Sequence, residues 1–223
     1  MRITLVYDNE VWKKGLEADW GFSCLVEVEG APRILFDTGT IGSILLRNME
    51  KLDIKPNSIE EIFISHSHLD HTGGLPDFLR VNNRVKVYIP ASCPKPRGAE
   101  KVISVKEPLQ IHENIFSTGE LKGIEQSLVV KTSKGLVVIV GCSHPGVGNI
   151  LEAASSLGSK SSSSGTNSKI YALIGGLHGF REFELLKDLE LVCPCHCTQY
   201  KSEIRRLYPE KCPECGAGKV IEI

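Results

Sequence analysis

Short apolar runs separated by polar turns dominate the chain, and this pattern is typical of β-strands. In the first 65 residues it predicts strands at residues 2–7, 22–28, 33–36 and 61–65. Between the last two of these strands, apolar residues recur with helical spacing. They predict a helix over residues 41–52, followed by a break at Pro56.

The rest of the chain combines further strands with helices. Strands are predicted at residues 84–89, 114–117, 124–131, 136–140, 170–174, 191–193 and 219–223. Helices are predicted at residues 73–81, 146–157 and 181–189, and again after Thr198. The serine-rich segment 155–168 has low complexity and is expected to form a mobile surface loop.

Two apolar strands end alike, one in Ser65-His66 and the other in Gly141-Cys142-Ser143-His144. Each follows a run of strands and leads into a glycine-rich helix start. Two such halves would form one mixed α/β domain over residues 1–223, with two packed sheets and helices outside them, an αββα sandwich. The histidines would then gather at one edge of the sheets, where the strands end.

The charge balance narrows the classes of partner. The 223 residues include 26 basic and 27 acidic side chains, which argues against a nucleic-acid-binding protein. No apolar stretch approaches the ~18 residues that cross a bilayer, so no membrane association is expected. The N-terminal segment lacks the apolar core of a signal peptide, which favours a cytoplasmic protein with reduced thiols. The sequence does not define an oligomeric state.

The strongest chemical signal is the run from Ser65 to Gly74, which follows a predicted strand. It places four potential metal ligands within six residues: His66, His68, Asp70 and His71. His66 and His68 are two residues apart, so an extended chain directs both to one face. Imidazole and carboxylate together suit Zn²⁺, with Mn²⁺ or Fe as alternatives.

This run resembles the His-x-His-x-Asp-His signature of the metallo-β-lactamase superfamily. Three further strings resemble superfamily motifs in the same order along the chain: Phe36-Asp37-Thr38-Gly39, Gly141-Cys142-Ser143-His144-Pro145-Gly146 and Cys195-His196-Cys197-Thr198. The resemblance covers about residues 3–200. It implies an αββα fold with one or two divalent metals at one sheet edge.

The resemblance also implies roles for individual residues. His66, His68 and His144 would hold a first metal, and Asp70, His71 and His196 would hold a second. Asp37 would orient ligands through hydrogen bonds without binding metal. Asp70 could also accept or relay a proton during catalysis.

One departure from the superfamily pattern concerns the carboxylate that bridges the two metals in many members. The corresponding segment, residues 174–179, contains no carboxylate. His178 lies in this segment and is a candidate catalytic residue, either as a metal ligand or through a hydrogen bond to substrate. The alternative is an ordinary loop histidine. Without a bridging carboxylate, a one-metal enzyme also stays open.

Five cysteines crowd into 23 residues near the C-terminus: Cys193, Cys195, Cys197, Cys212 and Cys215. Four of them could form a structural zinc site that ties residues 193–215 to the domain. Buried reduced thiols or a disulfide are the alternatives. Cys142 precedes His144 by two residues, so it could face the site, but packing in the core is the favoured interpretation.

The resemblance implies a metal-dependent hydrolase that acts on a phosphorylated or anionic small molecule through a metal-bound hydroxide. The motif strings are similar to one branch of the superfamily in particular. That branch includes an archaeal synthase that condenses a dihydropterin methyl diphosphate with a ribofuranosyl-aminobenzene phosphate, a reaction of methanopterin-type cofactor biosynthesis. This synthase reaction is therefore the alternative function. A metal-binding module without turnover is a third possibility.

Overall fold

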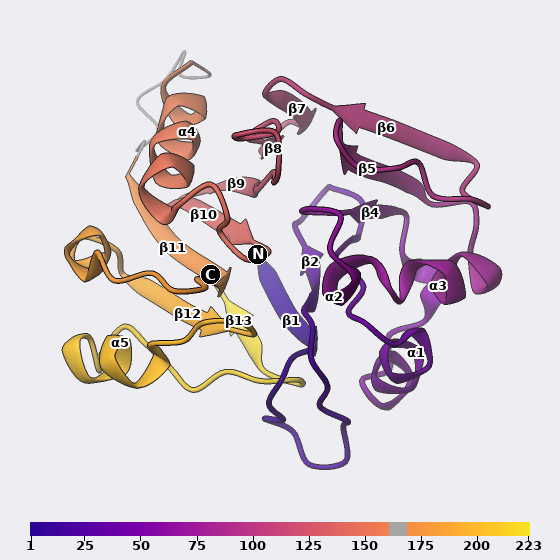
Figure 1. Cartoon of the computed structure of the whole chain (residues 1–223), viewed down its shortest axis with the longest axis horizontal. Coiled ribbons are helices and arrows are strands. Elements are labelled where there is room, and N and C mark those ends of the chain that lie inside the picture. The colour runs from indigo at the N-terminus through magenta and orange to yellow at the C-terminus, as the bar shows by residue number, and fades with distance from the viewer. Residues whose placement is uncertain (161–168) are drawn as a thin grey trace.

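Two β-sheets face each other at the centre of the computed structural model, which describes residues 1–160 and 169–223 (Figure 1). The first sheet has the strand order β13-β1-β2-β3-β4-β5-β6. Its strands are β1 (Arg2–Tyr7), β2 (Ser23–Glu27), β3 (Ile34–Phe36), β4 (Glu61–Phe63), β5 (Lys86–Pro90), β6 (Lys101–Val105) and β13 (Val220–Glu222). The second sheet has the order β12-β11-β10-β9-β8-β7. Its strands are β7 (Leu109–His112), β8 (Ile115–Ser117), β9 (Leu128–Thr132), β10 (Gly135–Val140), β11 (Ile170–Gly176) and β12 (Leu191–Cys195).

Helices cover the outer face of each sheet. The first sheet carries α1 (Gly42–Lys51), α2 (Leu69–Thr72) and α3 (Leu75–Val81), with the short 3₁₀ turn η1 (Pro56–Ser58). The second sheet carries α4 (Val147–Lys160), η2 (Phe183–Leu186) and α5 (Lys201–Leu207). The predicted αββα sandwich is therefore confirmed.

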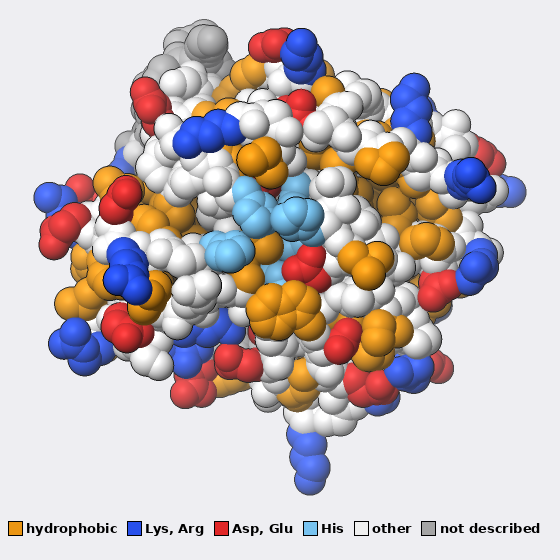
Figure 2. Space-filling view, viewed as in Figure 1, with side chains coloured by type: hydrophobic (Ala, Val, Ile, Leu, Met, Phe, Trp, Pro, Cys, Tyr) orange, Lys and Arg blue, Asp and Glu red, His pale blue; other side chains and the backbone are white. Residues whose placement is uncertain are grey.

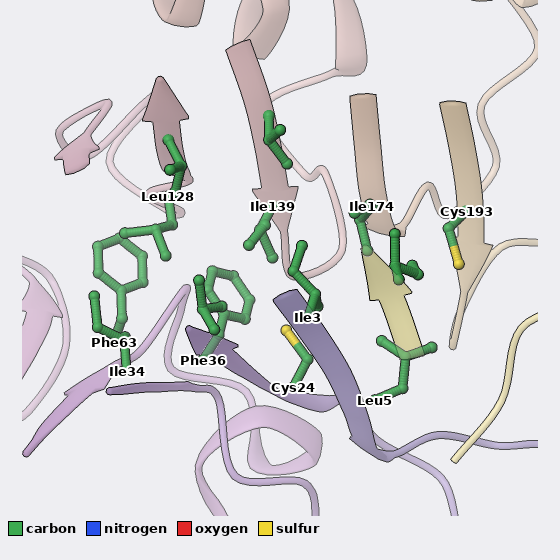
Figure 3. Packing of buried hydrophobic residues seen from close by; sticks show 14 of the residues in the cluster. Ile3, Leu5, Cys24, Ile34, Phe36, Phe63, Leu128, Ile139, Ile174 and Cys193 are labelled. Atoms are coloured by element: carbon green, nitrogen blue, oxygen red, sulfur yellow. The ribbon is translucent and has the colours of Figure 1, made fainter. Parts of the chain in front are cut away.

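Both faces of the central strands are buried, which explains their nearly continuous apolar sequences. In β10, Val137 and Ile139 point into the core between the sheets, whereas Val138 and Val140 pack on the helix side. Figure 3 shows the layer between the sheets, where Phe36 and Phe63 stack beneath Leu128 and Ile139. Apolar burial of this extent is the main force that holds the two sheets together.

Most predicted elements are present, and the differences have local causes. The strands β6 and β7 were not predicted, and only the four-residue turn η2 replaces the predicted helix over 181–189. The strand predicted from residue 124 begins at Leu128, because Glu125 and Gln126 turn their side chains to other loops. Helix α4 continues to Lys160, which corrects the first part of the predicted serine-rich loop. The rest of that loop, residues 161–168, lies outside the described residues.

Parallel strand pairing creates one edge where several chain segments emerge together. Strands β3 and β4 run parallel, as do β10, β11 and β12. In parallel sheets the carboxyl ends of strands meet at one edge, where ligands commonly bind.

In the part of the chain that the structure covers, no helix combines the length and apolarity that crossing a membrane requires.

Candidate metal centre

Polar residues lie together at the carboxyl ends of six strands. The residues that follow these ends are Asp8 after β1, Asp37 after β3, His66 after β4, His144 after β10, His178 after β11 and His196 after β12. Figure 2 shows the histidine side chains gathered in the middle of one face of the molecule, beside an acidic side chain. The edge therefore joins residues that are up to 188 positions apart in the sequence.

Several of these residues adopt a backbone conformation that non-glycine residues rarely use. Asp37, Ser143, His178 and His196 have φ angles of 52°, 61°, 47° and 46°. Such left-handed conformations cost free energy, and they persist where the surrounding structure requires them. Here they turn the chain sharply at the strand ends, so that side chains converge on the site.

At this edge, two groups of side chains have ligand atoms within 4.8 Å of one another. The first consists of Asp70, His71, Cys142 and His196. The second consists of His66, Cys142 and His144. His68 adjoins the second group, since its Nδ1 lies 3.1 Å from Nε2 of His66. The six residues proposed as ligands from the sequence thus lie together, and Cys142 belongs to both groups.

Asp37 orients the histidine run without facing the ligand groups itself. Its Oδ2 lies 2.7 Å from Nδ1 of His71 and accepts a hydrogen bond from the Ser65 hydroxyl at 2.6 Å. The Ser65 backbone N–H donates to Oδ1 at 2.7 Å. Ser65 Oγ in turn accepts from Nδ1 of His66 at 2.9 Å. These bonds leave Nε2 of both His66 and His71 directed at the site.

His196 is held by two residues that the sequence analysis did not identify. Asn9 Oδ1 lies 2.9 Å from Nδ1 of His196, and the Asn9 amide donates to the His196 carbonyl at 3.1 Å. The His196 backbone N–H donates to Asp8 at 2.9 Å. Nε2 of His196 is therefore free to face Asp70, whose Oδ2 lies 3.1 Å away. The location of Asp8 and Asn9 directly after the first strand was the only signal in the sequence.

Glu125 anchors the loop that carries His144, and it was also missed. This fully buried carboxylate accepts hydrogen bonds from four consecutive backbone N–H groups, those of residues 141–144, at 2.8–3.1 Å. Burial raises the pKa of Glu125, although the backbone N–H groups oppose this shift. The hydrophobic pattern of the sequence could not predict this role of Glu125, because its partners are backbone groups about 16–19 positions away.

Burial and mutual repulsion lower the pKa values of three of the clustered imidazoles, those of His66, His71 and His144. Burial lowers the pKa of His66, and the neighbouring His71 lowers it further. Burial also lowers the pKa of His71 well below its usual range, and the neighbouring His196 lowers it further. Partial burial raises the pKa of Asp70, but the hydrogen bond from His196 and the nearby histidines outweigh this effect and hold the pKa below its usual range. Neutral imidazole and ionised carboxylate are the forms that bind metal.

The donor set fits a metal ion. Nε2 of His144 is buried and has no hydrogen-bond partner within residues 1–160 and 169–223. A buried ring nitrogen without a partner is costly unless something else binds it. Imidazole nitrogens with a carboxylate in a compact group suit a divalent transition metal.

His178 lies at the rim rather than inside either ligand group. Its side chain is exposed, and its ring centroid is 5.2 Å from that of His144. It lines a cavity of about 760 Å³ together with His144, Lys122, Arg181 and the first residues of α4. This position suits contact with a substrate better than metal ligation.

The C-terminal cysteines do not form the four-cysteine site that was predicted. Cys193 and Cys215 are joined in a disulfide, and the Cys195 sulfur lies 3.7 Å from that of Cys193. Cys212 packs in a different apolar cluster, on the helix side of the second sheet, so the Cys-x-x-Cys pair does not converge. Cys197 turns toward the metal centre, where its sulfur donates to that of Cys142 at 3.3 Å. Cys197 and Cys212 are therefore excluded from a shared zinc site, and Cys193, Cys195 and Cys215 alone stay grouped.

Replacing Asn9 by alanine is expected to weaken divalent metal binding about 10–100-fold, the usual cost of losing a partner that orients a ligating histidine. The His196 ring would lose the acceptor that fixes its tautomer and orientation. Competition with a chromophoric chelator measures this affinity. Replacing Asn83, an exposed asparagine remote from the site, should leave the affinity unchanged, and an equal loss in both variants would contradict the orienting role.

Comparisons with known proteins agree with this geometry. A family model described as the metallo-beta-lactamase superfamily matches residues 21–150. The chain is 28% identical to a 7,8-dihydropterin-6-methyl-4-(beta-D-ribofuranosyl)-aminobenzene-5'-phosphate synthase of Methanocaldococcus jannaschii, over 98% of this chain and 95% of that protein. It is 27% identical to an uncharacterised protein of the same organism, over 90% and 91% of the two chains. It also resembles a crystal structure described as a metal-dependent hydrolase of the beta-lactamase superfamily, with 27% identity, a TM-score of 0.76 and coverage of 100% and 99%.

Proposed function

The chain belongs to the metallo-beta-lactamase superfamily, and from that premise we propose that it is a metal-dependent hydrolase of a phosphorylated or otherwise anionic small molecule. The observation that carries the proposal is the convergence of five histidines and one aspartate at one sheet edge. Bound divalent metals would supply Lewis acidity and lower the pKa of a bound water to about 7.

The residues divide into two sets of ligands in this proposal. His66, His68 and His144 hold one metal, and Asp70, His71 and His196 hold the other. Asp37, Ser65 and Asn9 keep the ring nitrogens aimed at these positions through the hydrogen bonds described above. Zinc fits these ligands, and manganese or iron are the alternatives.

The cavity beside His144 and His178 supports an anionic substrate. Lys122 and Arg181 line it with positive charge, and α4 begins in its wall at Val147. Backbone N–H groups at a helix start favour a bound anion. His178 would contact the substrate there, and Asp70 would accept a proton from the attacking nucleophile.

Turnover of model substrates tests the hydrolase proposal. Metal-loaded protein is expected to release nitrophenolate from nitrophenyl phosphate esters, and Asp70→Asn is expected to lower kcat about 10²–10⁴-fold. A broader screen adds lactones and thioesters. Metal binding without turnover of any of these substrates would contradict the hydrolase and leave the synthase and a metal-binding module as the candidates.

A second candidate function is the condensing synthase reaction, which the M. jannaschii synthase favours because the similarity extends over nearly the whole of both chains. In that reaction the departing diphosphate is the anionic group, and the aminobenzene partner attacks instead of water. Incubating the protein with a dihydropterin methyl diphosphate and the aminobenzene ribofuranosyl phosphate distinguishes the two functions. Condensed product supports the synthase, whereas hydrolysis of the diphosphate alone supports the hydrolase.

A further inference from the structure

We propose that Cys142 is a metal ligand of this centre, and that its thiolate is shared between the two metal positions with Cys197 as its hydrogen-bond donor. This inference rests on the metal centre of the proposed function and adds a residue to it. The sequence pattern had suggested an ordinary core cysteine at this position.

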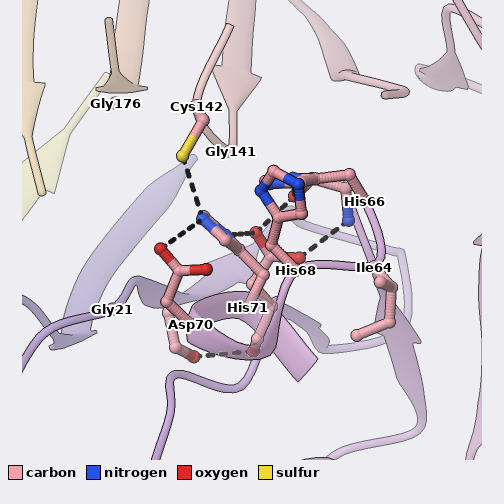
Figure 4. A network of polar contacts seen from close by, with 12 residues as sticks. Gly21, Ile64, His66, His68, Asp70, His71, Gly141, Cys142 and Gly176 are labelled. Carbon is pink, nitrogen blue, oxygen red and sulfur yellow. Dashed lines mark hydrogen bonds and ion pairs between the residues drawn. The ribbon is translucent and has the colours of Figure 1, made fainter. Parts of the chain in front are cut away.

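The Cys142 sulfur occupies the point where the two ligand groups meet. It lies 3.1 Å from Nε2 of His71, which is the nitrogen that Asp37 leaves free. It is also within 4.8 Å of the ligand atoms of His66 and His144 in one group and of Asp70 and His196 in the other. Figure 4 shows the sulfur reaching from the second sheet toward the ring of His71 on the first. Cys142 therefore contacts ring nitrogens of the site as well as the apolar core.

The backbone near Cys142 shows why β11 places no side chain beside it. Residues 174–179 carry no carboxylate, and Gly176 stands beside the Cys197 sulfur and the Cys142 backbone. A Cβ on Gly176 would lie 2.7 Å from the Cys197 sulfur and 3.4 Å from the Cys142 Cα. A larger residue is thus excluded from β11 at this point, and the Cys197 sulfur can approach that of Cys142.

Charge and ligand chemistry favour the same assignment. Among the proposed histidine and aspartate ligands, Asp70 is the only one with a negative charge, whereas two dications bring four positive charges. A thiolate adds a second negative charge, and thiolate is a strong ligand for zinc and other borderline-soft metals. When the metal binds, the S–H bond of Cys142 breaks, a sulfur–metal bond forms and the proton leaves to solvent. The S–H group of Cys197 donates to the Cys142 sulfur at 3.3 Å.

Cobalt substitution tests the proposal with a readout that does not depend on activity. Wild-type protein loaded with Co²⁺ is expected to show sulfur-to-cobalt charge-transfer absorption in the near ultraviolet, and Cys142→Ser is expected to lose it. Cys197→Ser should keep the absorption. Cys195→Ser is the matched control, because Cys193, Cys195 and Cys215 are the other grouped sulfurs. Absorption that survives in Cys142→Ser, or that disappears in Cys195→Ser, would overturn the proposal.

X-ray absorption of zinc-loaded wild-type protein needs no variant and therefore covers the case in which Cys142→Ser fails to fold. A sulfur neighbour at about 2.3 Å is expected in protein whose C-terminal disulfide is intact. Zinc with only nitrogen and oxygen neighbours would reject Cys142 as a ligand and leave the proposed metalloenzyme standing. Failure to bind any divalent metal would reject both.

Discussion

Replacing Glu125 by alanine is expected to lower the free energy of unfolding by about 3–5 kcal/mol. The four backbone N–H groups of residues 141–144 would lose their acceptor inside the protein, and each buried donor left without a partner costs about 1–3 kcal/mol before water or local movement compensates. For a chain of this size the midpoint of thermal unfolding should fall by roughly 10 °C. The loop that carries Cys142 and His144 would also lose its fixed shape, so metal affinity should fall with stability.

Denaturant unfolding of the metal-free protein measures the first effect, and chelator competition measures the second. Glu125→Gln is informative because it keeps one carbonyl oxygen but places an amide N–H₂ near the His144 N–H, so an intermediate loss is expected. Glu113→Ala, on an exposed turn, is the matched control and should change stability by less than about 0.5 kcal/mol. If Glu125→Ala unfolded at the wild-type denaturant concentration, the anchoring role would be wrong.

Replacing His68 by alanine is expected to lower the activity of the metal-loaded enzyme by at least about 10³-fold, since Lewis acid assistance is worth several kcal/mol. His68 is exposed, so its removal opens no cavity in the core. Its Nδ1 nevertheless lies 3.1 Å from Nε2 of His66, at the proposed first metal position. The loss should therefore come from metal binding and catalysis, with the stability of the metal-free protein unchanged.

Metal content, kcat and thermal unfolding of the same preparation separate these effects. His112→Ala is the control, because His112 pairs with Glu61 at 2.8 Å, outside the ligand groups. That variant should retain wild-type metal content and activity. Full activity in His68→Ala with one metal per chain would show that the first position is not needed for turnover.

The sequence predicted the strands and the histidine run well because both depend on local patterns. Burial of both faces gives β10 a continuous apolar sequence, and the spacing of His66 and His68 in an extended segment directs both side chains to one face. The parallel strands then carry His144 and His196 to the same edge, which the fold class alone implies.

The residues that support the ligands could not be predicted in this way. Glu125 and Asn9 act on backbone or ring atoms that are distant in the sequence, and the contact depends on the shape of two loops. Cys142 and Cys197 meet only because Gly176 lets β11 pass close to both. The Cys-x-x-Cys spacing of Cys212 and Cys215 was misleading, since the strand and helix that flank it separate the two sulfurs into different clusters.

The two sheets each contribute ligands to the same centre, and this has a mechanical consequence. His66 and Asp70 follow β4 of the first sheet, whereas His144 and His196 follow β10 and β12 of the second. In the proposed metal-loaded protein, one ion would close a chain loop from His66 to His144 and the other a longer loop from Asp70 to His196, much as long-range cross-links do. Force that separates the sheets at this edge would have to break metal–ligand bonds before it reached the apolar layer behind them. The bonds that serve the chemistry of the site would thus also reinforce the sandwich at this edge, in addition to the apolar layer.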